Sequence, residues 1–335
     1  MAGALFLAGC SSSSSSPTAS GSSSSGSGSA PVTLRLGLLA NITHAPALVG
    51  IQKGFFTKNL GSNKLTTTVY NSGTQETTAI LAGQLDAAYV GPNPAINAFQ
   101  KSGGTGIKII SGVATGGASV VVKPSITSAA GLKGKVVDTP SLGNTQDVAI
   151  RYYLKQNGLA TTTTGGGDVT IKPTNPNSDA VLQFQSGQIA GASEPSPYDV
   201  EMVKDGGKVL FSEPGATTLL IVTQSFLKAH PAVVSDLLKG QIEANDYIAK
   251  DTSAAQTSAN TELAALTGKG IKSSILPAAF KEITFTNDPD ASSLATDAQQ
   301  AKAVGLLTST SLSGIFDLGP LNQLLQAAGE PQVNS

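Results

Sequence analysis

Hydrophobic positions along the chain recur with two alternating periods, one typical of strands and one typical of helices. Short apolar runs predict strands, and apolar residues spaced three and four apart predict the helices between them. In the first third of the chain the strands are expected at Thr33–Leu39, Thr66–Tyr70, Leu85–Val90 and Ile107–Val113. This regular alternation predicts an α/β fold whose neighbouring strands are mostly parallel.

One short pattern is written twice. Gly83–Ala88 (GQLDAA) is echoed by Gly187–Ala192 (GQIAGA), 104 residues later. Each copy follows a predicted helix, reads as a turn and a short strand, and leads into a pair of prolines. A unit repeated once in each half predicts two similar α/β lobes, with a ligand cleft between them.

A second group of strands follows Gly116-Gly117. These strands are expected at Ser119–Val122, Lys135–Asp138, Val169–Lys172 and Lys208–Phe211. The helix Thr145–Gln156 belongs to this group, and its spacing favours one apolar face formed by Val148, Ala149, Tyr152 and Tyr153.

Two segments are expected to connect the lobes. The chain leaves the first lobe through Thr115–Ala118 and returns through Ser212–Thr218, so these two crossings would form a hinge. The tail from Gln224 carries helical apolar stripes. We therefore expect lobe 1 to comprise residues 32–115 and 223–335, and lobe 2 to comprise residues 116–222.

The first thirty residues differ in composition from the rest. Met1–Gly9 is small or apolar and precedes Cys10, the one cysteine in the sequence, and Ser11–Ser29 is nearly all Ser and Gly. This segment resembles a bacterial lipobox with a flexible tether, which implies a partial lipoprotein signal at 1–9, a lipidated Cys10 and a tether to residue 30. The segment lacks the basic residues of a secretory signal, and the alternative is a chance cysteine after a short apolar end.

Composition and motifs exclude several classes. Charged residues are only 13% of the chain and the net charge is −1, so there is no basic field for nucleic acid. The two histidines are far apart and no carboxylate cluster accompanies them, which argues against a metal site. Nucleophile-elbow, phosphate-loop and dinucleotide-binding patterns are absent from the sequence. We expect a protein that is not an enzyme and that carries no cofactor.

Five segments, taken in order and spacing, resemble periplasmic solute-binding proteins of the aliphatic sulfonate, nitrate and taurine family. The resemblance covers about residues 32–328. The five segments are Asn41–Phe56, which ends in Lys-Gly-Phe-Phe; Gly83–Pro94; Ser141–Gln146; Glu194–Pro197; and Phe226–Pro231.

The resemblance implies a two-lobed clamshell of the type II periplasmic-binding-protein class with a helical C-terminal tail. By that likeness the chain would capture a small anionic or zwitterionic solute outside the membrane and deliver it to an ABC permease. We expect a monomer, anchored to the cell membrane through Cys10.

The expected ligand contacts are His44, Asn93, Ala118, Asn144, Thr145, Gln146 and Glu194. Asn93 directly precedes Pro94, and Asn144 stands three residues before Asp147, so both can cap helices that start at the cleft. Free N–H groups and partial positive charge at such starts suit an anion without a fixed cation. His44, in the first turn, could donate from either ring nitrogen or serve only the structure of that turn.

Glu194 leaves the ligand open. In the family the corresponding loop tends to read Val-Pro-Glu-Pro-Trp, whereas this chain has Glu194-Pro195-Ser196-Pro197-Tyr198. The carboxylate could face the cleft and select an amine or a hydrogen-bonding ring, or it could be solvated on the rim. Because the family that the chain resembles also includes binders of a thiamine-precursor pyrimidine, such a ring, stacked on Tyr70, Tyr89 or Tyr198, is an alternative ligand. A domain that senses a solute is a further alternative.

Overall fold

The structure is a computed structural model that describes residues 30–335. Contacts divide the chain into two units, Met1–Pro31 and Val32–Ser335. The expected lipoprotein signal, the lipidation of Cys10 and nearly all of the tether lie outside the described residues. The fold described below is that of Val32–Ser335.

The first of two sheets has six strands in the order β11-β4-β10-β3-β1-β2. β1 is parallel to β2 and β3, whereas β10 is antiparallel to β3 and β4, and β11 is antiparallel to β4. Its strands are β1 (Thr33–Leu39), β2 (Lys64–Tyr70), β3 (Ala87–Val90), β4 (Ile107–Gly116), β10 (Ala216–Thr223) and β11 (Ile283–Phe285). Every residue of β3 and β10 is buried, as expected for central strands covered on both faces.

The second sheet has five strands in the order β7-β6-β8-β5-β9. β6 is parallel to β7 and β8, and β5 is antiparallel to β8 and β9. Its strands are β5 (Ala118–Val122), β6 (Val136–Thr139), β7 (Thr170–Pro173), β8 (Gly191–Pro195) and β9 (Lys208–Ser212). We call each sheet with its helices a lobe, the six-stranded sheet defining lobe 1 and the five-stranded sheet lobe 2.

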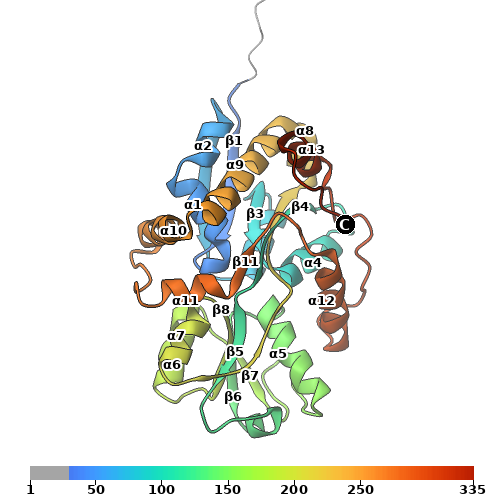
Figure 1. The fold of residues 1–335 in the computed structure, drawn as a ribbon. Helices are drawn as coiled ribbons and strands as arrows, with labels where there is room; N and C mark the ends of the chain where they lie inside the picture. The colour runs from blue at the N-terminus through green and yellow to red at the C-terminus, as the bar shows by residue number, and fades with distance from the viewer. Residues whose placement is uncertain (1–29) are drawn as a thin grey trace, which may run out of the picture. The chain divides into compact units, whose positions relative to one another are not determined.

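Helices accompany both sheets (Figure 1). Those of lobe 2 are η2 (Ala129–Leu132), α5 (Thr145–Gln156), α6 (Asn177–Gln185) and α7 (Tyr198–Lys204). Lobe 1 begins with η1 (Ile42–His44), α1 (Ala45–Gln52), α2 (Phe55–Leu60), α3 (Gly73–Leu81) and α4 (Pro92–Lys101). The tail adds α8 (Gln224–Ala229), α9 (Pro231–Lys250), α10 (Thr252–Thr267), α11 (Leu276–Lys281), α12 (Ala291–Ala303) and α13 (Gly319–Ala328).

The tail packs mainly on lobe 1. α9 lies against α1 and α2, α10 lies against α1, and α12 contacts α4. Apolar residues of α9, such as Val234, Leu237 and Leu238, share one core with Leu36 and Leu48 near the start of the chain. The stripe in α9 that the sequence indicated is therefore the face that closes the core of lobe 1.

The two crossings between the sheets run side by side. The first crossing is at Gly117, between the last residue of β4 and the first residue of β5, and the second lies between β9 and β10. The N–H of Gly116 at the end of β4 donates to the carbonyl of Gly215 in the second crossing at 3.0 Å. Gly117 has a φ of 71° and a Cβ there would lie 2.2 Å from Ile283, so only glycine fits. The lobe boundaries stay predictions. β10 already pairs with β4 at Ala216, so the second crossing ends within the expected segment Ser212–Thr218. Residues 216–222 therefore belong to the six-stranded sheet, although they were expected in lobe 2.

The repeated unit is confirmed as helix, turn and strand. Gly83 follows α3 and Gly187 follows α6, with φ of 72° and 77°, and the chains then enter β3 and β8. Such left-handed positions after a helix favour glycine, which explains why both copies begin with it.

The expected apolar face of α5 is partly wrong. Ile150 and Leu154 pack on the sheet, and Arg151 is buried beside them, whereas Ala149, Tyr152 and Tyr153 are only half-buried and face a groove next to α12. The spacing had placed Tyr152 and Tyr153 on the apolar face, but both lie at the edge of the groove with part of the ring exposed. They do so because the sheet covers only one side of α5.

Within residues 30–335, no helix combines the length and the apolar character needed to span a bilayer.

Candidate functional site

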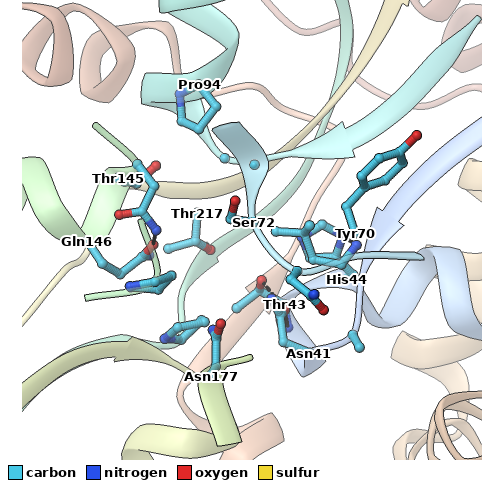
Figure 2. Close-up of a pocket in the computed structure, with 18 of the residues that line it drawn as sticks. Asn41, Thr43, His44, Tyr70, Ser72, Pro94, Thr145, Gln146, Asn177 and Thr217 are labelled. Carbon is cyan, nitrogen blue, oxygen red and sulfur yellow. Dashed lines mark hydrogen bonds between the residues drawn. The ribbon is translucent and has the colours of Figure 1, made fainter. Parts of the chain in front are cut away.

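A cavity of about 60 Å³ lies where loops of both lobes meet (Figure 2). From lobe 1 its wall includes Leu39, Ala40, Asn41, Thr43, His44, Tyr70, Asn71, Ser72, Gly73, Gly91, Pro94 and Thr217. From lobe 2 it includes Pro140, Asn144, Thr145, Gln146, Pro176, Asn177, Pro195 and Tyr198. The cavity has room for about four to six groups the size of a water molecule.

The wall carries no formally charged side chain. Among the described residues that line the cavity there is no Asp, Glu, Lys or Arg. Its polar groups are hydroxyls, amides, one imidazole and backbone N–H groups. Any ligand held here is therefore recognised by hydrogen bonds and dipoles.

Several helices begin at the cavity. α5 starts after Asn144, whose Oδ1 accepts a hydrogen bond from the N–H of Asp147 at 2.9 Å, so the predicted cap is confirmed. α3 starts after Ser72, whose hydroxyl accepts from the N–H of Gln75 at 3.4 Å. α6 starts after Pro176 with no side-chain cap. The first N–H groups of these helices have no partner inside the helix, and the three starts concentrate partial positive charge at one place.

His44 lies in the wall and is only 1% exposed. Its Nδ1 accepts a hydrogen bond from the N–H of Leu39 at 3.2 Å. Burial lowers the pKa of His44 to about 3, so the imidazole is neutral at pH 7 and carries its proton on Nε2. Of the two ring nitrogens that were expected to be able to donate, only Nε2 is therefore free to do so.

Thr145 and Gln146 form the first turn of α5. The Oγ1 of Thr145 accepts from the N–H of Asn93 at 3.4 Å, which links the starts of α5 and α4 across the two lobes. Gln146 accepts from the Nδ2 of Asn144 through Oε1 at 3.0 Å, which leaves its own NH₂ group as a donor. The structure thus brings four of the predicted contacts together in one wall: His44, Asn144, Thr145 and Gln146.

Asn93 does not cap a helix, and it does not line the cavity. α4 begins two residues earlier than expected, at Pro92, with Gly91 as its N-cap. Proline needs no N–H at the first helical position and has a helical φ, so Pro92 rather than Pro94 opens the helix. The Nδ2 of Asn93 donates to the carbonyl of Asp297 at 3.2 Å, which ties α4 to α12.

Ala118 and Glu194 also lie outside this wall. Ala118 lines a separate cavity of about 300 Å³ beside the crossings. Glu194 is fully buried in β8, and neither of its oxygens has a hydrogen-bond donor among the described residues. Glu194 is therefore neither solvated on the rim nor part of the cavity wall, the two positions that the sequence had left open. Its neighbour Pro195 reaches the wall instead.

Several wall residues were not predicted as ligand contacts. Ser72 stands three residues before Gln75, a spacing typical of a helix cap, but it was not predicted as part of the site. Asn41, whose Oδ1 accepts from the N–H and hydroxyl of Thr43, belonged only to a segment that resembles the family. Asn177 follows a proline and could have been recognised as a helix start. Of the three tyrosines considered for stacking, Tyr70 and Tyr198 line the cavity, whereas Tyr89 is buried with its hydroxyl on Gln241.

Several solved structures share this fold. The alkanesulfonate-binding protein SsuA from Xanthomonas axonopodis pv. citri, bound to MOPS, has a TM-score of 0.70 at 17% identity, over 85% of this chain and 97% of that one. The nitrate-binding protein NrtA from Synechocystis PCC 6803 has a TM-score of 0.73 at 15% identity, over 90% of each chain.

A third similar structure is a cysteine-to-serine mutant of DSZB in complex with biphenyl-2-sulfinic acid. It has a TM-score of 0.62 at 16% identity, over 88% of this chain and 99% of that one. At such identities these likenesses establish the fold alone, which is that of the periplasmic binding proteins, and they confirm the expected fold class.

The family is established by sequence. The model of the NMT1-like family matches residues 27–264, which is more than half of the chain, and the chain belongs to that family. A search of curated protein sequences gives no significant match.

Proposed function

We propose that this protein is the extracytoplasmic solute-binding component of an ABC importer and that it captures a small oxyanion of the nitrate or sulfonate type. The observation that carries the proposal is the convergence of the starts of α3, α5 and α6 on one cavity without charged side chains. Backbone N–H groups at helix starts bind anions without a counter-charge. The fold shared with SsuA and NrtA supports the same class of ligand.

Ligand binding would act through the hinge. Hydrogen bonds between the lobes already include the N–H of Ile42 to the carbonyl of Ser196 at 2.9 Å and the hydroxyl of Tyr198 to the carbonyl of Ala40 at 2.9 Å. A solute held by donors of both lobes favours the closed form, because those contacts exist only when the lobes meet. The permease of the importer would then distinguish the loaded form from the empty one.

The remaining parts of the proposal concern the chain as a whole. We infer a monomer tethered to the membrane through a lipidated Cys10, without catalytic turnover of its ligand. Replacing Cys10 with Ser should move the protein from the membrane fraction to the soluble fraction of the cells that make it. A Cys10→Ser protein that stays in the membrane fraction rejects the lipid anchor and leaves the solute proposal intact.

A ligand screen tests the proposal directly. The chain from Val32 onward is heated with nitrate, methanesulfonate, taurine, bicarbonate and pyrimidines, and the compounds that stabilise it are titrated by calorimetry. A ligand at about 100 times its Kd should raise the melting temperature by an amount on the order of 5 °C. Binding of nitrate or a sulfonate supports the proposal, and a response to neither rejects it. Recovery of the ligand chemically unchanged after overnight incubation supports a binding role.

A thiamine-precursor pyrimidine is the second candidate. Tyr70 and Tyr198 both lie in the cavity wall, where aromatic faces could hold a ring. The hydroxyl of Tyr198 is held by Ala40, so that ring is fixed in place. Stabilisation by pyrimidines without stabilisation by anions would favour this candidate. A sensing role would require a signalling partner in place of a permease.

A further inference from the structure

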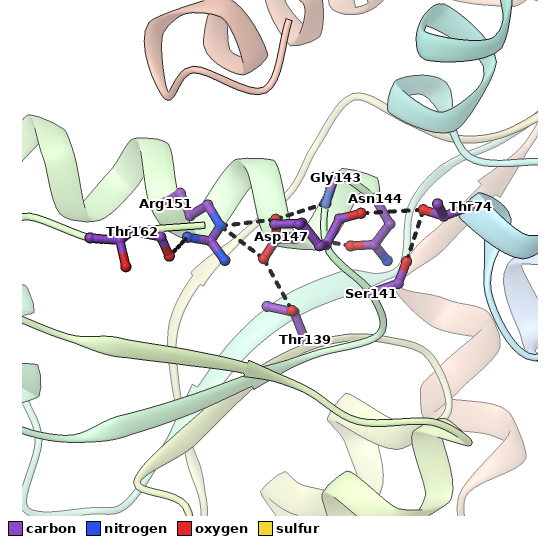
Figure 3. A network of polar contacts seen from close by, with 9 residues as sticks. Thr74, Thr139, Ser141, Gly143, Asn144, Asp147, Arg151 and Thr162 are labelled. Atoms are coloured by element: carbon purple, nitrogen blue, oxygen red, sulfur yellow. Dashed lines mark hydrogen bonds and ion pairs between the residues drawn. The ribbon is translucent and has the colours of Figure 1, made fainter. Parts of the chain in front are cut away.

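Behind the start of α5 lies a buried ion pair. Arg151 is 2% exposed and Asp147 is fully buried, and the Nε of Arg151 lies 2.9 Å from the carboxylate of Asp147, one helical turn away (Figure 3). Neither residue lines the cavity. Arg151 is among the largest side chains that are fully buried in the described part of the chain.

The carboxylate of Asp147 also holds the loop that leads into α5. Its Oδ2 accepts from the N–H of Gly143 at 2.9 Å, and its Oδ1 accepts from the hydroxyl of Thr139 at 3.2 Å. In return the N–H of Asp147 donates to Asn144. This arrangement resembles a capping box, except that the acid at the third helical position bonds to the N–H of Gly143, one residue before the cap.

Arg151 connects this cap to a second loop. Its Nη1 donates to the carbonyl of Thr162 at 2.8 Å, and Thr162 belongs to a tight loop closed by the hydrogen bond from its N–H to the carbonyl of Gly166. The guanidinium is therefore held on two sides. It fixes the orientation of the carboxylate, which in turn holds the hydroxyl of Thr139 and the N–H of Gly143.

The held loop is part of the cavity wall. Pro140, Asn144, Thr145 and Gln146 all line the cavity, and Ser141 reaches lobe 1 through a hydrogen bond of 3.1 Å between its hydroxyl and that of Thr74. A buried ion pair is an inefficient source of stability, because the desolvation cost offsets much of the attraction. We therefore attribute to this pair a role in holding the loop before α5 in place.

We propose that Arg151 and Asp147 are positioning residues, which set the first turn of α5 and the loop Thr139–Asn144 in the geometry that binds the ligand. The proposal rests on the proposed function of the cavity. Displacement of binding groups by about 1 Å can cost on the order of a hundredfold in a preorganised site. The pair therefore controls affinity without touching the ligand.

The control is another Arg–Asp pair, whose arginine is more exposed. Arg35 donates to Asp86 at 2.5 Å and to the carbonyl of Gly83, so it also clamps a turn, but it lies in lobe 1 away from the cavity wall. Arg151→Met and Arg35→Met are compared with the wild type by calorimetric titration of the solute identified in the screen. Each titration is made at a temperature where denaturation curves show the variant fully folded.

We expect Arg151→Met to raise the Kd at least tenfold and Arg35→Met to leave it within twofold. Arg151→Lys, which keeps a cation beside Asp147, should recover most of the affinity. An Arg151→Met protein whose Kd stays within twofold of the wild type, whatever its melting temperature, overturns the proposal. Equal losses of affinity in both Met variants overturn it as well, because they would reflect stability alone.

A milder variant and a ligand-free measurement complete the test. Thr139→Val removes only the hydroxyl bonded to Asp147 and should raise the Kd about threefold. Hydrogen exchange of the peptide 139–146 without ligand should be faster in Arg151→Met than in the wild type, and unchanged exchange contradicts the positioning role. If the wild type binds no screened solute, the proposed function fails, and the exchange measurement still decides whether the pair orders the loop.

Discussion

Residues that line the cavity and residues buried inside lobe 2 are only one or two positions apart at the ends of β6 and β8, yet the two regions differ in their charged groups. Pro140 and Pro195 face a cavity without charged side chains, whereas Asp138 and Glu194 are fully buried acids just before them. Burial raises the pKa of Asp138 to about 7, and burial together with the neighbouring Asp138 raises the pKa of Glu194 well above its usual range.

Two further acids lie nearby: Asp199 is buried in α7, and Glu213 is half-buried at the second crossing. Burial raises the pKa of Asp199 to about 6 and that of Glu213 to about 7, and each accepts hydrogen bonds from serine hydroxyls. Protonated carboxyl groups avoid the cost of burying a charge. The comparison teaches that burial favours the neutral form of these acids and that the buried Arg–Asp pair lies behind the wall, so dipoles dominate the site itself.

The largest effect should come from placing a charge in the wall. Gln146→Glu puts a carboxylate at the start of α5, where it stabilises the helix but repels an anion. At about 4 to 5 Å and an effective dielectric near 20 the repulsion is about 3 to 4 kcal/mol, so the Kd should rise by roughly two to three orders of magnitude. Calorimetric titration measures the Kd. The control is Gln188→Glu on an exposed turn, and equal affinities for the two variants would refute the neutral-wall interpretation.

Removing one N–H from the wall should have the next largest effect. Thr145 is the first residue of α5, where proline is tolerated, and Asn144 has the extended backbone that precedes proline readily. Thr145→Pro should weaken binding by about 1.5 to 3 kcal/mol, the value of a hydrogen bond to a charged group. Thr145→Val keeps the N–H and serves as the matched control for the lost hydroxyl. Affinity that falls equally in both variants would show that the hydroxyl, not the helix start, is what binds.

The buried acids behind the wall should make the free energy of unfolding depend on pH. Between about pH 4 and pH 7 the folded chain keeps protons that the unfolded chain releases, so the free energy of unfolding falls as the pH rises through this window. Each retained proton contributes about 1.4 kcal/mol per pH unit. His44 acts oppositely below about pH 6.5, because only the unfolded chain takes up its proton there, but it is one group against several acids.

Urea denaturation at pH 5.5 and pH 8 measures this dependence. The wild type should be more stable at pH 5.5, and Glu194→Gln should reduce the difference by making one buried group permanently neutral. Glu243→Gln, on a partly exposed side chain of α9, should leave the difference unchanged. A wild type that is more stable at pH 8 would contradict the neutral state of these acids.

The smallest expected effect is on affinity as the pH changes. The wall groups that titrate are His44, with a pKa near 3, and Tyr70 and Tyr198, whose pKa values burial raises. None of them changes charge between pH 5.5 and 8.5, and nitrate and sulfonates keep one negative charge throughout. The Kd should therefore vary by less than about twofold over this range while the stability changes. A steep loss of affinity within the range would place a titrating group in the site.

Local features of the site followed from the sequence. Asn144 three residues before Asp147 predicted a cap, and Gly83 and Gly187 marked the turns after α3 and α6. These features depend on hydrogen bonds and backbone angles within a few residues, so neighbouring side chains suffice to define them. The alternation of strands and helices likewise predicted an α/β fold. The expectation of mostly parallel neighbouring strands was wrong, because β5, β10 and β11 pair with their neighbours antiparallel.

Other features depended on how distant segments pack. Tertiary structure decided that Ser72, Asn177 and Thr145 meet, because sheet order and crossovers determine which helix starts share a cavity. It decided that Glu194 is buried behind the wall and that Arg151 lies inside α5's interface with the sheet, since a sequence period locates a face but not what covers it. The amino-acid sequence by itself determined the helix starts and turns of this protein, and only the packing of the two lobes determined which of them face one another.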